Sequence, residues 1–200
     1  MNHRISVGIA AAAAIALVVA GCGGSDESVS TTKESTVSMA TPPPSATSTA
    51  AAAEGDYSGL LIKPSDIGPD VTANGAPAAN PGGITGTGQV FETADRRDII
   101  ISIAVLPDPA AAAAMIQPMK DTIADKVNGE QKPVDVGSNG FMVEGPAKKK
   151  SMEVSEVVFT QGRALVDLEY DSAPGNPAPS DAVLEVARKQ AAAVAAGLPG

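Results

Sequence analysis

The stretch from Ser25 to Asp56 most constrains the fold, because it has almost none of the large apolar side chains that a core requires. Ser, Thr, Ala and Pro dominate it, including the run Thr41-Pro42-Pro43-Pro44. Such a segment buries too little apolar surface to offset the entropy of ordering its backbone. We therefore expect all folded structure in residues 57–200, a length that suits one core and is too short for two.

The first 22 residues have the pattern of an export signal. His3 and Arg4 give a basic start, and an apolar run over residues 5–20 follows. This run is long for a signal peptide and marginal for a membrane span. It ends in Val19-Ala20-Gly21-Cys22, which resembles the lipobox of bacterial lipoproteins. In that motif the cysteine thiol takes a diacylglycerol before the signal is cleaved.

The lipobox resemblance implies three segments. We expect a signal peptide over residues 1–21, then Cys22 carrying diacylglycerol and palmitate-type acyl chains at the head of a flexible tether over residues 22–56. The globular domain would follow over residues 57–200. The protein would then sit on the outer face of the cell membrane, anchored by lipid at Cys22. An uncleaved N-terminal anchor is the alternative and would place the domain on the same side.

Cys22 and His3 are the only cysteine and histidine, so the predicted domain contains neither. This excludes disulfides within it, a cysteine nucleophile and catalysis with histidine as base. A zinc site would have carboxylate ligands alone, which zinc disfavours. We therefore expect no catalytic residues, no metal, no cofactor and no enzymatic activity. The net charge of -9 argues against nucleic acid and against anionic headgroups as partners.

Residues 57–127 predict two strands followed by one helix. The branched apolar run Ile99 to Leu106 is typical of a well-buried central strand. Asp108-Pro109 is a typical helix start, and Pro118 is expected to kink the helix because it lacks an N–H. The expected elements, in order, are a short helical turn within Leu60 to Gly68, a Gly/Pro-rich loop over residues 74–86, strands at 87–93 and 99–106 joined by a polar turn at 95–98, and a helix over 108–127.

Residues 134–200 predict four strands and a last helix, with a bulge near Ser155 where the apolar pattern of its strand changes phase. Short turns make neighbouring strands antiparallel. We expect a single α+β domain of order β-β-α-β-β-β-β-α, with both helices on one face of the sheet and the other face solvated. The expected elements are strands at 134–136, 141–143, 152–160 and 164–170, a turn at 138–140, and a helix that begins at Ser180 or Asp181 and stops at Gly197.

Several motifs admit a functional interpretation that is weaker than a structural one. Asp167, Glu169 and Asp171 share one strand face, which favours a solvated surface over a calcium site. The glycines of residues 82–88 precede a strand, whereas a phosphate loop follows one. Ser30-Thr31-Thr32-Lys33 matches a Ser-x-x-Lys pair but lies in the tether. Lys148-Lys149-Lys150 is the only basic cluster and suits a soluble loop, and four methionines (Met115, Met119, Met142 and Met152) suit core packing better than a cavity lining.

Two resemblances to known families are present. The opening Leu60-Leu61-Ile62-Lys63-Pro64-Ser65-Asp66-Ile67 is similar to that of an extracellular sensor-like domain found in mycobacterial lipoproteins and in a mycobacterial receptor serine/threonine kinase. The closing run Arg163 to Leu168, followed by an alanine-rich helix, is similar too. The order of elements also resembles the PsbP-like fold. Abundant Ala and Gly fit a high-GC actinobacterial genome. Both resemblances imply binding of a ligand or partner.

These observations predict a cell-envelope lipoprotein that displays a non-enzymatic, sensor-like binding or accessory module. Its expected partners are the membrane, through the lipid on Cys22, and an unidentified envelope protein or lipid. Two alternatives stay open. One is a lipid or glycolipid carrier with an apolar cavity between sheet and helices. The other is an envelope enzyme that uses carboxylates or a Ser/Lys pair.

Overall fold

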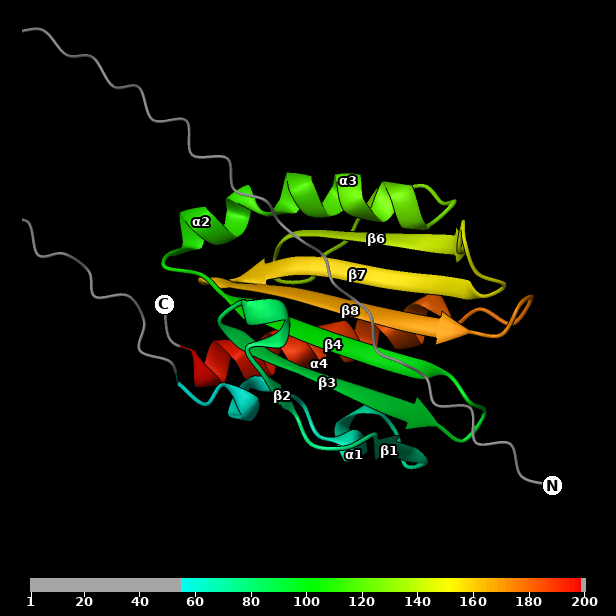
Figure 1. The fold of residues 1–200 in the computed structure, drawn as a ribbon, viewed down its shortest axis with the longest axis horizontal. Helices are drawn as coiled ribbons and strands as arrows, with labels where there is room; N and C mark the ends of the chain where they lie inside the picture. The colour runs from blue at the N-terminus through cyan, green and yellow to red at the C-terminus, as the bar shows by residue number, and fades with distance from the viewer. Residues whose placement is uncertain (1–54, 199–200) are drawn as a thin grey trace, which may run out of the picture. The chain divides into compact units, whose positions relative to one another are not determined.

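The structure, a computed structural model, describes residues 55–198. The predicted signal peptide (1–21), the lipidation site Cys22 and almost all of the predicted tether (22–56) lie outside the described residues. One antiparallel sheet of eight strands organises the described part, in the order β1-β3-β4-β8-β7-β6-β5, with β2 also paired to β3 (Figure 1). The strands are β1 (Val71–Ala73), β2 (Ala78–Ala79), β3 (Gly86–Thr93), β4 (Asp98–Val105), β5 (Lys132–Pro133), β6 (Ser138–Pro146), β7 (Glu153–Gln161) and β8 (Ala164–Ser172).

Helices pack on both faces of this sheet. The long helix α4 (Ser180–Gly197) shares one core cluster with alternate residues of the central strands, among them Ile99, Ile101 and Leu168. The helices α2 (Pro109–Ala114) and α3 (Ile116–Lys126) lie against the opposite face, where Ile123 belongs to a second cluster. Our expectation that both helices share one face and leave the other solvated was wrong, because β6 and β7 carry buried apolar residues on both faces.

Strand β7 shows why the two-sided burial escaped the sequence pattern. Val157, Val158 and Phe159 are consecutive and all fully buried, so the alternation of one-sided strands is lost. We interpreted this loss as a bulge near Ser155, and that was wrong: β7 keeps an unbroken register with β8 from Glu153 to Gln161. The irregularity lies in β6 instead, where the register against β7 shifts between Ser138 and Phe141.

The predicted helix over residues 108–127 is present as two pieces. Asp108 caps the first, since its Oδ1 accepts a hydrogen bond from the Ala111 N–H at 2.7 Å, and Pro109 occupies the first turn. The break falls at Met115, three residues before Pro118. Pro118 therefore sits in the first turn of α3, where a backbone N–H has no partner within the helix.

The segment before the sheet is fixed by a buried polar side chain. A short turn (η1, Ser58–Leu60) and the helix α1 (Pro64–Ile67) confirm the predicted helical opening. Gln190 of α4 is fully buried; its Nε2 donates to the Leu60 carbonyl at 2.7 Å, and its Oε1 accepts from the Ile62 N–H at 3.2 Å. These two bonds satisfy one backbone group at the end of η1 and one in the link between η1 and α1.

The α+β class and the long strands are confirmed, and the short elements differ from the prediction. The loop expected over residues 74–86 contains β2 and a single turn (η2, Pro81–Gly83), and β1 was not predicted. The strand expected at 134–136 lies instead at Lys132–Pro133, and the turn expected at 138–140 forms the start of β6. Within residues 55–198, no helix has both the length and the hydrophobicity that a bilayer crossing requires.

Candidate functional site

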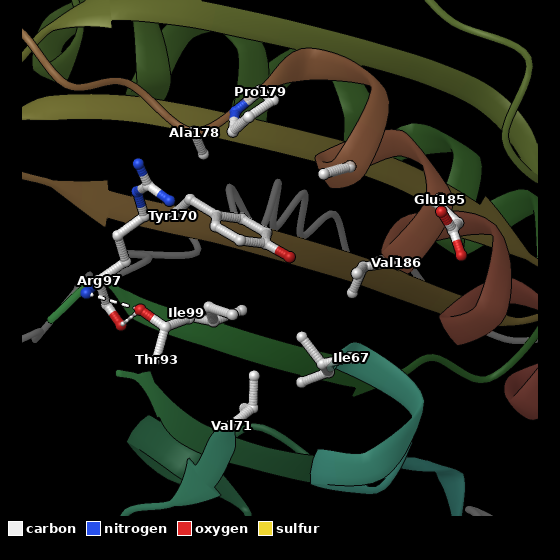
Figure 2. A pocket seen from close by; sticks show the side chains of 11 residues that line it. Ile67, Val71, Thr93, Arg97, Ile99, Tyr170, Ala178, Pro179, Glu185 and Val186 are labelled. Carbon is white, nitrogen blue, oxygen red and sulfur yellow. Dashed lines mark hydrogen bonds between the residues drawn. The ribbon is translucent and has the colours of Figure 1, made fainter. Parts of the chain in front are cut away.

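An apolar recess of about 190 Å³ lies between α4 and the sheet, bordered by α1, β1 and the start of β4 (Figure 2). Its walls come from segments far apart in the chain, because α4 returns across the sheet after the last strand. Aliphatic side chains dominate the lining, and Tyr170, Arg97, Thr93 and Glu185 bring the polar groups. The remaining lining residues are Ile67, Val71, Ile99, Ala178, Pro179, Ala182 and Val186.

Tyr170 supplies the central polar group of the recess. It lies on β8 opposite Ile99 of β4, so both side chains point to the α4 face. Figure 2 shows its hydroxyl pointing into the space between Ile67 and Val186. Burial raises the pKa of the Tyr170 hydroxyl above its usual value, so this group stays protonated and is able to donate a hydrogen bond.

Arg97 closes the neighbouring wall. Its Nη1 pairs with Asp95 at 2.8 Å, and its Nη2 donates to Asn176 Oδ1 at 3.1 Å. Thr93 orders this corner, since its hydroxyl donates to Asp95 Oδ1 at 2.6 Å. The same hydroxyl accepts from the Arg97 N–H at 2.9 Å (Figure 2). The hydrogen bond from Thr93, followed by the charge of Arg97, lowers the pKa of the Asp95 carboxyl. The buried Arg97 Nε has no partner among the described residues.

The volume and the lining of the recess limit the size and the chemistry of a ligand that would fit it. An engineered apolar cavity of about 150 Å³ admits benzene, so about 190 Å³ suits roughly six to eight carbon atoms. Drug-sized ligands fill roughly 300–1,000 Å³. The recess therefore suits the apolar end of a small molecule, with a polar head directed to the Tyr170 hydroxyl or toward the positive charge of Arg97.

The opposite face of the sheet carries a second unusual group, which we term the carboxylate face: Glu92, Asp98, Glu156, Asp167, Glu169 and Asp171. The strand register places these residues on adjoining strands. Glu156 lies directly opposite Glu169, and Asp171 lies directly opposite Asp98, which faces Glu92. None of the six has an ion-pair partner within 4.0 Å among the described residues.

Glu156 is the most buried member of the carboxylate face, with 1% of its surface exposed. Among the described residues, only the neighbouring carboxyl of Asp167 forms a hydrogen bond with its carboxyl group. Burial, followed by the charges of Asp167 and Glu169, raises the pKa of Glu156 well above its usual range. Burial and the charges of Asp171 and Asp167 raise the pKa of Glu169 to about 8. At neutral pH this face therefore holds protons that exposed carboxylates would have lost.

The structure corrects one interpretation of the sequence and supports others. Asp167, Glu169 and Asp171 share a face as predicted, but they are partly buried, so the solvated surface we expected is wrong. No three acidic, histidine or cysteine side chains within residues 55–198 are placed to hold a metal ion.

Lys148 connects the basic loop, residues 148–150, to α3, since its Nζ donates to the Ala124 carbonyl at 2.6 Å. The four methionines pack in or against the two core clusters, and none lines the recess.

Sequence reasoning missed the recess and Glu156. Tyr170 was assigned to an apolar strand face, and Arg97 to a polar turn, and nothing local connects the two. Glu156 lies in a strand dominated by apolar residues. A single charged residue in such a strand is a signal that its side chain faces a specific partner. The residue it faces, Glu169, is fixed by strand register and by no local pattern.

Comparison with known proteins gives one informative likeness. No family model and no curated protein matches this chain. Among solved structures, the extracellular domain of PknH from Mycobacterium tuberculosis is similar, with a TM-score of 0.52 and 10% sequence identity. The match covers 69% of this chain and 94% of that one. It confirms the predicted likeness to a sensor-like extracellular domain at the level of the fold, while the PsbP-like likeness stays a prediction.

Proposed function

We propose that this chain is a lipid-anchored extracellular binding module, and that the recess beside Tyr170 receives the apolar end of a small ligand. The recess carries the proposal, because an apolar lining with a few convergent polar groups, here Tyr170 and Arg97, is typical of ligand sites. The fold shared with an extracellular domain and the lipobox-like sequence ending at Cys22 support placement outside the membrane.

Binding without catalysis is the simplest interpretation of this site. The polar groups at the recess include no histidine or cysteine, and Tyr170 stays protonated because it is buried. Arg97 is engaged by Asp95 and Asn176 and its Nε is buried, so it contributes positive charge beside the recess. A carrier of whole diacylated lipids would need a cavity well above this volume, so the carrier alternative is less favoured.

The experiment is a titration of the full chain, purified in detergent, with straight-chain carboxylates and alcohols of four to eight carbons. Methyl NMR signals of Ile67, Ile99 and Val186 report on the recess. We expect saturable shifts of these signals. Ala182→Leu places a larger side chain at the recess and should abolish them. Ala195→Leu makes the same change at an exposed site on the same helix, outside the recess, and should leave them intact.

Shifts that fail to saturate, or that persist in Ala182→Leu, would contradict a ligand site at the recess. A comparison of the two ligand series then identifies the head group. Carboxylates that bind more tightly than the matching alcohols would indicate a contact with Arg97, and equal affinities would indicate Tyr170 alone.

A further inference from the structure

The hydroxyl of Tyr170 is a polar group that points into an apolar space. Only 6% of the Tyr170 surface is exposed, and its hydroxyl forms no hydrogen bond with another described residue. Figure 2 shows the hydroxyl directed toward Ile67 and Val186, on the side of the ring away from Arg97. A molecule that fills the recess displaces water from this hydroxyl. It must then supply a hydrogen-bond acceptor, because a donor left unpaired in apolar surroundings costs about as much as a lost hydrogen bond.

The polar groups of the wall beside Tyr170 are already engaged. Arg97 pairs with Asp95 through Nη1 and donates to Asn176 through Nη2, and its Nε is buried. The Thr93 hydroxyl donates to Asp95 and accepts from the Arg97 N–H. Of these side chains, Tyr170 is the one whose hydrogen-bonding group stays free to meet a ligand.

A negative charge is unfavourable at the position of the Tyr170 hydroxyl. Glu185, which pairs with Lys189 at 2.8 Å, lies on the hydroxyl side of the ring (Figure 2). Ionisation of Tyr170 would itself place an anion there. Burial raises the pKa of Tyr170, and the positive charge of Arg97 opposes this rise only in part. A ligand carboxylate beside the hydroxyl would lose its hydration in the same surroundings, so we expect a neutral head group.

The remaining walls limit the rest of the ligand to a short aliphatic part. Aliphatic side chains dominate the lining, and a volume of about 190 Å³ suits roughly six to eight carbon atoms. A carbonyl oxygen accepts hydrogen bonds and brings no donor of its own, so it leaves nothing unpaired beside Tyr170. An alcohol adds a second hydrogen, and one hydrogen bond between two hydroxyls leaves one of the two hydrogens unpaired.

We propose that the recess selects neutral molecules of about six to eight carbons whose carbonyl oxygen accepts a hydrogen bond from the Tyr170 hydroxyl. Short aliphatic ketones and esters belong to this class, whereas carboxylates and plain hydrocarbons do not. This inference rests on the proposed function and names the ligand class of the same site. Tyr170 is then the residue that sets the specificity of the recess, while the aliphatic walls set the length of the ligand.

The probes are three molecules of similar shape. The first is 2-hexanone; in 2-methyl-1-hexene a CH₂ group replaces its carbonyl oxygen, and in pentanoate an ionised oxygen replaces the methyl group on its carbonyl carbon. Each is titrated into the full chain in detergent, and the methyl NMR signals of Ile67, Ile99 and Val186 report on binding. Because detergent takes up the probes unequally, each affinity is compared between wild type and variant under the same conditions.

Tyr170→Phe keeps the ring and removes only the hydroxyl. We expect it to weaken the binding of 2-hexanone about fivefold and to change the affinity for 2-methyl-1-hexene less than about twofold. Tyr57→Phe removes the other tyrosine hydroxyl of the chain, outside the recess, and should leave both affinities unchanged. In the wild type, pentanoate should bind about tenfold more weakly than 2-hexanone.

Equal effects of Tyr170→Phe on the ketone and the alkene would overturn the proposal, because the hydroxyl would then not recognise the carbonyl. Pentanoate that binds as tightly as 2-hexanone would also overturn it, in favour of a charged head beside Arg97. Both results leave the recess as a ligand site. Absence of saturable binding of any probe to the wild type, or binding that survives Ala182→Leu, would contradict the proposed function as well. The comparison of ketone and carboxylate in the wild type stands even if Tyr170→Phe misfolds.

Discussion

Replacing Glu169 by Gln is expected to stabilise the protein, and increasingly so as the pH rises. Glu169 is half-buried on β8, opposite Glu156 and Ile100, and it makes no ion pair among the described residues. Gln has nearly the same shape and carries no charge. The substitution therefore removes the cost of ionising a partly buried carboxyl and keeps the volume of the side chain.

The expected magnitude follows from the pKa of Glu169, which rises from 4.5 to about 8 on folding. The folded protein binds more protons than the unfolded chain between these two values. The free energy of unfolding of the wild type therefore falls as the pH rises from about 5 to 8 and levels off above 8. One pKa unit corresponds to about 1.4 kcal/mol, which gives an upper limit of about 5 kcal/mol. Glu169 is only partly buried and solvent screens its charge, so we expect about 2–3 kcal/mol.

The assay is urea denaturation of wild type and Glu169→Gln at several values between pH 5 and pH 8.5, followed by far-ultraviolet circular dichroism. The two proteins should differ little at pH 5 and by about 2–3 kcal/mol at pH 8. Glu130→Gln, at an exposed site, should follow the wild type throughout. A difference between wild type and Glu169→Gln that is independent of pH would refute the reasoning, because it would show that Glu169 titrates normally in the folded state.

Two further predictions concern the anchor and the opening segment. Cys22→Ala should leave the domain folded and release the protein from membranes, as measured by fractionation; continued membrane association would mean an uncleaved anchor. Gln190→Leu should lower the free energy of unfolding by about 2–4 kcal/mol, since it leaves the Leu60 carbonyl and the Ile62 N–H buried without partners. Urea denaturation measures this loss, and a cost equal to that of the exposed change Gln117→Leu would contradict the role of Gln190.

The sequence predicted those elements that local patterns encode. The apolar run of residues 99–106 predicted the central strand β4, because branched residues buried by neighbouring strands leave a continuous signal. The Asp108-Pro109 cap predicted the start of α2, because capping depends on residues within one turn. These features need no knowledge of what packs against them.

The predictions that failed concern features that depend on residues distant in the chain. In the sequence, burial of both faces of β7 gives the same pattern as a bulge that shifts the alternation of apolar residues. Only the position of α3 against the second face distinguishes two-sided burial from a bulge. Gln190 is one polar residue in an alanine-rich helix, and its role depends on backbone atoms about 130 residues away. The recess joins Ile67, Tyr170 and Val186, which meet only after the whole sheet has formed.

The most direct test of the central claim is a native mass spectrum of the protein extracted from its membrane, compared with a denaturing spectrum. A small molecule that is held in the native spectrum and lost on denaturation is the result expected of a binding module. Its absence from Ala182→Leu and its presence in Ala195→Leu would place it in the recess. A native spectrum without any bound molecule, in wild type and in both variants, would contradict the assignment of the recess as a ligand site.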